Sequence, residues 1–183
     1  MRKSIVLVVD GEQEALNSAR KVVSTEDFQA VFAGNAKSAL EIMAENKVNV
    51  LVAGVNLPDM EGVALLKKVN NKYPDIIKIV LLDRENLASI LTSANQGNIF
   101  RFIMKPWKAE QEIAFIIREA VEYYNLRQDN IEIEASLKRN SEAYKNLLRN
   151  MEEQLYGCRY DLDIGKKYII KILDHLAGFS KIK

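Results

Sequence analysis

Five short apolar runs, separated by segments with helical periodicity, constrain the fold of this chain more than any other feature. The runs are rich in β-branched residues and cover residues 5–9, 28–33, 48–53, 77–82 and 99–104. The first, Ile5-Val6-Leu7-Val8-Val9, is apolar without alternation, which is typical of a strand buried on both faces of a parallel sheet. We therefore predict an α/β fold with a doubly wound, five-stranded parallel sheet.

The segments between these runs are expected to be helices that cover both faces of the sheet. One carries apolar residues at helical spacing over Ala36, Ala39, Leu40 and Met43. In doubly wound folds, functional groups gather at the carboxyl ends of the strands. Four residues stand at those ends and form the candidate site: Asp10, Gly54, Asp83 and Lys105.

Composition favours a cytoplasmic protein with one domain of ordinary size and an appendage. The chain has 183 residues, of which 48% are hydrophobic, and its 26 basic and 25 acidic side chains nearly cancel. We therefore expect binding to neither nucleic acid nor membrane, because no net field attracts the chain to an anionic surface. One cysteine excludes an internal disulfide, and no apolar stretch approaches the roughly 18 to 20 residues of a membrane span. The only histidine, His175, cannot build a histidine-rich metal cluster, and we predict no metal and no cofactor.

Three motifs at the strand ends carry a resemblance to a known family. They are Val8-Val9-Asp10-Gly11-Glu12, the segment from Val50 to Gly62, and Phe102-Ile103-Met104-Lys105-Pro106-Trp107. In this order, these motifs resemble the response-regulator receiver family over residues 1–125. The resemblance implies a flavodoxin-like strand order of 2-1-3-4-5 and a pocket in which paired acids hold Mg²⁺.

The resemblance assigns roles to several residues of the pocket. In the family, acids after the first strand help to bind the metal, and a lysine after the fifth strand contacts the phosphate. Asp10, Glu12 and Lys105 match these positions. Asn56 stands where the family offers a main-chain carbonyl to the metal, and Phe102 stands at the position of a switch aromatic.

Three positions depart from the family pattern. Gly54 occupies the place of the phosphoacceptor aspartate, Gly11 replaces one of the paired acids, and Asp83 replaces a hydroxyl residue that contacts the phosphate. Glycine offers no nucleophile, and the loss of two carboxylates is expected to weaken Mg²⁺ binding. The pattern predicts a degenerate pseudo-receiver with no enzymatic activity.

Several residues also have simpler interpretations. Asp10 is placed to cap the helix that follows it, and Phe102 is placed to act as a packing group. Asp59 and Glu61 are expected to complement the dipole of the helix that follows them. Lys105, deprived of a phosphoaspartate, is predicted to pair with Asp10 or Asp83, because an unpaired ammonium at a strand end is costly.

Residues 126–158 follow a heptad pattern that predicts a coiled-coil helix and a parallel homodimer. This segment contains no proline or glycine before Gly157, so the last helix of the receiver could run directly into it. The alternatives are a single solvated helix and a helix folded back on the receiver. We call the following positions the seam: Leu126, Asn130, Ile133, Leu137, Asn140, Tyr144, Leu147 and Met151.

The apolar pattern of residues 159–183 predicts a short C-terminal helix. This helix is similar to the segment that precedes larger output modules such as HD-GYP phosphodiesterases. The leading hypothesis is a two-component (phosphorelay) signalling protein whose partner is a kinase or an output protein. Two alternatives remain open. One is the regulatory N-terminal part of a larger output enzyme, and the other is a regulator that is phosphorylated at an atypical residue.

Overall fold

A computed structural model describes residues 3–83, 99–107, 110–157 and 163–179. The chain divides into two compact units, Met1–Ile131 and Glu132–Lys183. The first unit contains a sheet with helices on both faces, and the second contains helical segments only among its described residues. None of the described helices has both the length and the apolar character that a membrane span requires.

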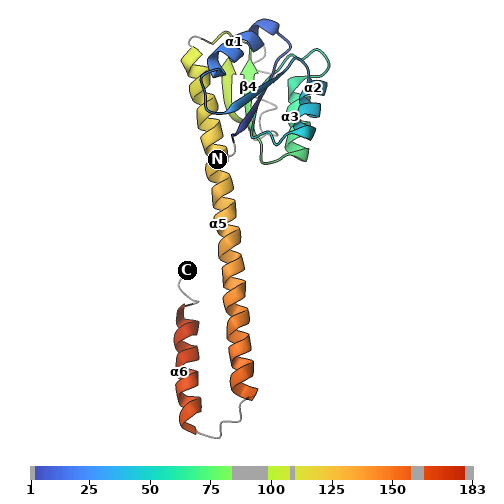
Figure 1. The fold of residues 1–183 in the computed structure, drawn as a ribbon. Helices are drawn as coiled ribbons and strands as arrows, with labels where there is room; N and C mark the ends of the chain where they lie inside the picture. Colours follow the sequence, from blue (N-terminus) through green and yellow to red (C-terminus); the bar gives the residue numbers. More distant parts are fainter. Residues whose placement is uncertain (1–2, 84–98, 108–109, 158–162, 180–183) are drawn as a thin grey trace. The chain divides into compact units, whose positions relative to one another are not determined.

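The sheet has five parallel strands in the order β2-β1-β3-β4-β5, which confirms the predicted fold (Figure 1). In the centre of the sheet, Val8 of β1 pairs with Phe32 of β2 on one side and with Val52 of β3 on the other. Every residue of β3 and β4 is buried, as the apolar runs predicted. The strands are β1 (Ile5–Val9), β2 (Gln29–Ala33), β3 (Val50–Gly54), β4 (Ile77–Leu82) and β5 (Ile99–Met104).

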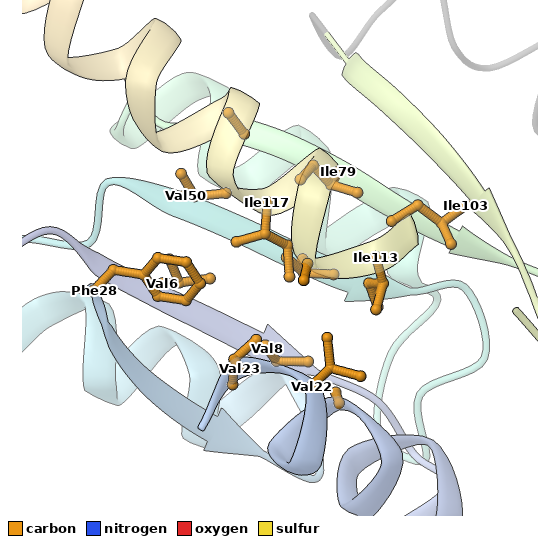
Figure 2. Close-up of a cluster of buried hydrophobic side chains, with 14 of the residues drawn as sticks. Val6, Val8, Val22, Val23, Phe28, Val50, Ile79, Ile103, Ile113 and Ile117 are labelled. Atoms are coloured by element: carbon orange, nitrogen blue, oxygen red, sulfur yellow. The ribbon is translucent and has the colours of Figure 1, made fainter. Parts of the chain in front are cut away.

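Helices cover the two faces of the sheet. One hydrophobic cluster joins the strands to α1 (Gln13–Val23) and to the first turns of α5 (Glu110–Gly157). Figure 2 shows Ile113 and Ile117 of α5 packed in this cluster. The second cluster joins the opposite face to α2 (Ala36–Glu45) and α3 (Gly62–Lys72). The helix expected between β4 and β5 falls outside the described residues.

The start of α2 is held by two side chains. Asn35 accepts a hydrogen bond from the amide of Ser38 at 2.8 Å. The Asp59 carboxylate accepts bonds from the amides of Ala36 and Lys37, each at 2.8 Å. The expectation that Asp59 serves the helix directly after it is therefore wrong, because its carboxylate caps α2. The strand–helix connections bring the two loops together, which no local pattern reveals.

The helix α5 continues without interruption from the first unit through the seam region, and α6 spans Asp163–Phe179. The apolar seam side chains are between 49% and 69% exposed, and both seam asparagines are also exposed. Exposed apolar side chains also occur along α6, at Tyr168, Ile170, Ile172 and Leu176. The continuation of the heptad pattern at Cys158 lies outside the described residues.

Candidate functional site

The candidate site lies at the carboxyl ends of β1, β3, β4 and β5, which the parallel sheet brings to one edge. Backbone hydrogen bonds extend the ladders just past the strands and position the first loop residues. The Asp10 amide donates to the carbonyl of Ala33 at 3.2 Å, and the Lys105 amide donates to the carbonyl of Leu82 at 2.7 Å. Both side chains are thus supplied by rigid elements.

Lys105 lies at the centre of a group of three acids. Its Nζ is 3.1 Å from Oδ2 and 3.3 Å from Oδ1 of Asp10. It is also 3.4 Å from Oε1 of Glu12 and 3.9 Å from Oδ2 of Asp83. The predicted pairing of Lys105 is present, and its principal partner is Asp10. Both residues of this principal pair are buried, with 9% exposure for Lys105 and 1% for Asp10.

The Asp10 carboxylate has a second role. Its Oδ1 accepts a hydrogen bond of 2.9 Å from the backbone amide of Glu12, directly before α1. The N-cap residue of α1 is Glu12, so Asp10 bonds the amide that directly precedes the helix and does not cap the helix itself. The two contacts hold the carboxylate between the start of α1 and the ammonium of Lys105.

The acids around Lys105 determine its protonation. Burial alone lowers the pKa of Lys105, but the charge of Asp10 and its hydrogen bond oppose this effect. With smaller contributions from Asp83 and Glu12, the pKa of Lys105 is raised above its usual value. Lys105 consequently remains a cation throughout the physiological range.

Gly54 leaves room for the Asp10 carboxylate. A Cβ atom on Gly54 would lie 2.5 Å from Oδ2 and 2.9 Å from Cγ of Asp10, which is closer than van der Waals contact allows. A Cβ atom on Gly11 would lie 2.8 Å from the carbonyl oxygen of Asn56 and 3.2 Å from Cδ of Pro58. The space around both glycines is therefore filled by neighbouring groups of the pocket.

The residues present do not fit Mg²⁺, the ion that the fold family implies. A divalent ion needs several carboxylate or carbonyl oxygens, and here the ammonium of Lys105 lies among the available carboxylates. A metal bound to these oxygens would lie beside a fixed positive charge. Within the described part of the chain, no group of three or more His, Cys, Asp or Glu side chains is arranged to hold a metal ion.

Asn56 and Phe102 were also predicted as site residues. Asn56 is exposed, and its Nδ2 donates to Oδ2 of Asp83 over a long 3.4 Å. Phe102 is partly buried and packs against the cluster under α2 and α3. The structure therefore connects Asn56 to the acid group, and it gives Phe102 a packing role.

A cleft of about 340 Å³ opens beside the charged group. Trp107 forms part of its wall, and its Nε1 donates a hydrogen bond to Oγ of Ser18 on α1 at 3.1 Å. The role of Ser18 was missed, because a lone serine in a helical segment carries no signal of a contact 89 residues away in sequence. The lining residues are Glu12, Glu14, Ala15, Ser18, Asp83, Lys105, Pro106 and Trp107.

Comparison with known proteins gives a family match and similar relatives. The family model described as "Response regulator receiver domain" matches residues 6–117. The hydrogenase transcriptional regulatory protein HoxA of Bradyrhizobium diazoefficiens is 28% identical over 154 residues, which cover 82% of this chain and 31% of HoxA. The DNA-binding transcriptional regulator NtrC of Escherichia coli is 25% identical over 128 residues, which cover 70% of this chain and 27% of NtrC.

The chain thus spans about a third or less of the length of these curated relatives. Among solved structures, the signal receiver domain of an HD domain-containing protein from Pseudomonas fluorescens Pf-5 is similar with a TM-score of 0.66 and 29% identity. The similarity covers 70% of this chain and 94% of that domain.

Proposed function

Because the chain belongs to the response regulator receiver domain family, we propose that it is a pseudo-receiver, a two-component signalling module that takes up no phosphoryl group. Receiver domains are regulators that interact with kinases or output domains. The observation that carries the proposal is the buried Lys105–Asp10 pair, packed where a side chain on Gly54 would begin. We propose that the module works in the cytoplasm through binding of a signalling protein, without enzymatic activity of its own.

The chemistry of aspartyl phosphorylation supports this proposal. The reaction needs a carboxylate in line with the phosphorus atom and a divalent ion that neutralises the developing charge. Gly54 supplies no carboxylate, and the carboxylate of Asp10 is engaged by Lys105 and by the Glu12 amide. Asp83 adds a negative charge where an incoming phosphoryl group needs a hydrogen-bond donor. The ammonium of Lys105 thus neutralises the carboxylates of the pocket without a bound metal.

The exposed seam supports a second part of the proposal, which is homodimerisation through α5. Its apolar side chains are about half exposed or more, and isolated helices are seldom stable without a packed face. Asn130 at a core position favours a two-stranded parallel arrangement. We retain residues 1–125 as the pseudo-receiver, 126–158 as the coiled-coil helix and 159–183 as a short C-terminal segment.

A direct experiment tests the loss of phosphoryl transfer. The protein is incubated with acetyl phosphate and Mg²⁺, and its intact mass is measured beside a receiver that carries the phosphoacceptor aspartate. We expect a gain of one phosphoryl group in the control and none in this protein. A gain on any pocket residue would contradict the proposal and support the alternative of an atypical phosphorylation site.

A second candidate function is the regulatory front end of an output enzyme. The observation that favours it is the similarity to a receiver domain from an HD domain-containing protein. Sequencing the coding region beyond the codon for Lys183 tests this candidate. An open reading frame that encodes an HD-type domain would support it, and an immediate stop codon would exclude it.

A further inference from the structure

Where α5 packs on the sheet, two of its faces have different environments. Ile113, Ile117, Ala120 and Tyr124 are buried and follow steps of four, three and four residues. The adjacent face carries Tyr123 and Leu126, which are 49% and 57% exposed. These two residues precede Asn130 with the three-four spacing of the seam. The spacing of the seam therefore extends back to Tyr123, within the receiver unit, where Leu126 is open and the ring of Tyr123 also contacts Phe100 of β5 with ring centroids 5.3 Å apart.

Opposite charges flank this part of the seam. With Tyr123 and Asn130 at heptad position a and Leu126 at position d, Glu122 takes position g and Arg127 takes position e. Glu122 is exposed, and the side chain of Arg127 is 41% exposed. Glu122 and Leu126 also line a cleft of about 490 Å³, so there is open space beside the helix.

We propose that a second copy of the chain binds this face in parallel and in register, with Glu122 of each copy paired to Arg127 of the other. The proposal rests on the proposed dimer and specifies its geometry. In a parallel pair, a g residue lies beside the e residue five positions later in the partner, so symmetry creates two attractive pairs. An antiparallel pair places g beside g and e beside e, so Glu122 of one copy would not meet Arg127 of the other.

The contacts within one chain do not prevent this arrangement. Arg127 has an intrachain partner, Asp75, but the distance is 3.4 Å and both side chains are substantially exposed. Such surface pairs contribute little to stability and exchange readily. In the next heptad, Asp129 would face Glu134 of the partner subunit, which is a like-charged pair. The attraction that determines the register is therefore concentrated at Glu122 and Arg127.

Charge reversal tests this geometry. The dimer dissociation constant is measured by analytical ultracentrifugation for the full chain and for Glu122→Arg, Arg127→Glu and the double variant. Each single change is expected to weaken the dimer by about threefold to tenfold, and the double variant is expected to return to within about twofold of wild type. Glu134→Arg is expected to strengthen the dimer by removing the repulsion with Asp129. Glu132→Arg, at the outward position c, is the matched control and is expected to change nothing.

Cross-linking gives an independent readout of orientation. In a Cys158→Ser background, Asn130→Cys places one thiol per chain at a core position. A parallel, in-register pair brings the two residues within disulfide distance, and we expect a cross-linked dimer on mild oxidation.

The results separate the two proposals. A wild-type protein that remains monomeric would overturn the dimer and this geometry with it. A wild-type dimer without charge-swap rescue, or without the cross-link at position 130, would overturn only the parallel register.

Discussion

At the scale of single residues, Lys105 has a fixed partner, the buried carboxylate of Asp10, where the family's lysine contacts a reversible phosphoryl group. Lys105→Met would leave the buried Asp10 carboxylate without its counter-charge. We expect the free energy of unfolding to fall by about 1 to 3 kcal/mol, because an unpaired buried charge is poorly solvated. Chemical denaturation measures the loss, and the exposed Lys67→Met is the control.

Two further measurements check the role of the pair. Asp10→Asn combined with Lys105→Met is expected to recover part of the loss, so a simply additive result would contradict the pairing. The pH dependence also has a defined sign. The folded-state pKa of Lys105 is raised, so its contribution is complete below pH 10.5 and is lost as pH rises through that raised pKa.

Gly54 permits a direct steric test. Gly54→Ala would place a Cβ atom against the carboxylate of Asp10, and we expect the protein to lose about 1 to 3 kcal/mol of stability. Gly34 is the matched control, because a Cβ atom there meets no atom within 4 Å. Gly34→Ala is expected to be neutral or to stabilise by about 0.4 to 1 kcal/mol. Equal effects of the two substitutions in thermal unfolding would show that Asp10 does not fill the Gly54 site.

The same crowding applies to an attempt to restore phosphorylation. Gly54→Asp must displace the Asp10 carboxylate from its contact with Lys105, and it leaves Gly11 and Asp83 unchanged. We expect no efficient uptake of a phosphoryl group from acetyl phosphate and Mg²⁺ by intact mass. Rapid and complete phosphorylation of this variant would mean that the other departures from the family pattern have little effect.

Lys78 in β4 is a buried cation that periodicity did not reveal. It is fully buried, and its Nζ donates to Oδ1 of Asn70 at 2.7 Å. Among the described residues, no carboxylate forms an ion pair with it. Burial and the nearby charge of Arg127 lower the pKa of Lys78, although Asp75 partly opposes them. The protonated form is therefore disfavoured in the folded state.

We expect Lys78→Met to raise the free energy of unfolding by about 1 to 3 kcal/mol at pH 7, because an apolar side chain suits this environment better. In the wild type, stability should rise with pH through the lowered folded-state pKa towards 10.5, since the unfolded chain binds the proton more tightly. The variant should lose this part of the pH dependence in urea unfolding. Lys47→Met, at an exposed position, serves as the control.

At the scale of secondary-structure elements, Asp59 links the loop after β3 to the start of α2. Asp59→Asn is expected to weaken this cap, because a carboxylate accepts the bonds from Ala36 and Lys37 better than a neutral amide does. Faster hydrogen exchange of these two amides measures the effect. Glu61→Gln is the control, because the side chain of Glu61 makes no cap bond although it is the N-cap residue of α3.

The cap also has a defined pH dependence. The amide hydrogen bond from Ala36 is the largest contribution, and together with that from Lys37 it outweighs the opposing effect of desolvation, so the pKa of Asp59 is lowered. The stabilisation is present above the ordinary value of 3.8 and is lost as pH falls through the lowered pKa. Amide exchange that is unchanged through this acid range would contradict the role of Asp59.

The strands and the acid group were predictable because they depend on local signals. The runs that became β1, β4 and β5 have the observed bounds, and their ends place Asp10, Asp83 and Lys105 at one sheet edge through topology alone. The Asp59 cap and the Trp107–Ser18 bond were not predictable, since each joins loops or helices through tertiary packing. The ranking of Asp10 as the main partner of Lys105 likewise depends on the space beside Gly54.

At the scale of the whole molecule, the proposed dimer depends on the seam residues that follow Ile131. A chain that ends after Ile131 retains the described contacts of Asn125 with Ser4 and of Arg127 with Asp75. It lacks six of the eight seam residues, and we expect it to be monomeric by light scattering while the full chain is dimeric. A truncated chain that still forms the dimer would move the main interface onto the receiver unit.

The hydrogen bond between Trp107 and Ser18 gives this molecule a built-in spectroscopic probe. Trp107 is the only tryptophan in the chain, so all indole emission comes from one wall of the cleft beside Lys105. Tryptophan emission shifts with local polarity, and separation of the indole from α1 would expose it to water. Tryptophan fluorescence of the unlabelled protein therefore reports directly on events at the pocket, because the helices that follow contain no tryptophan.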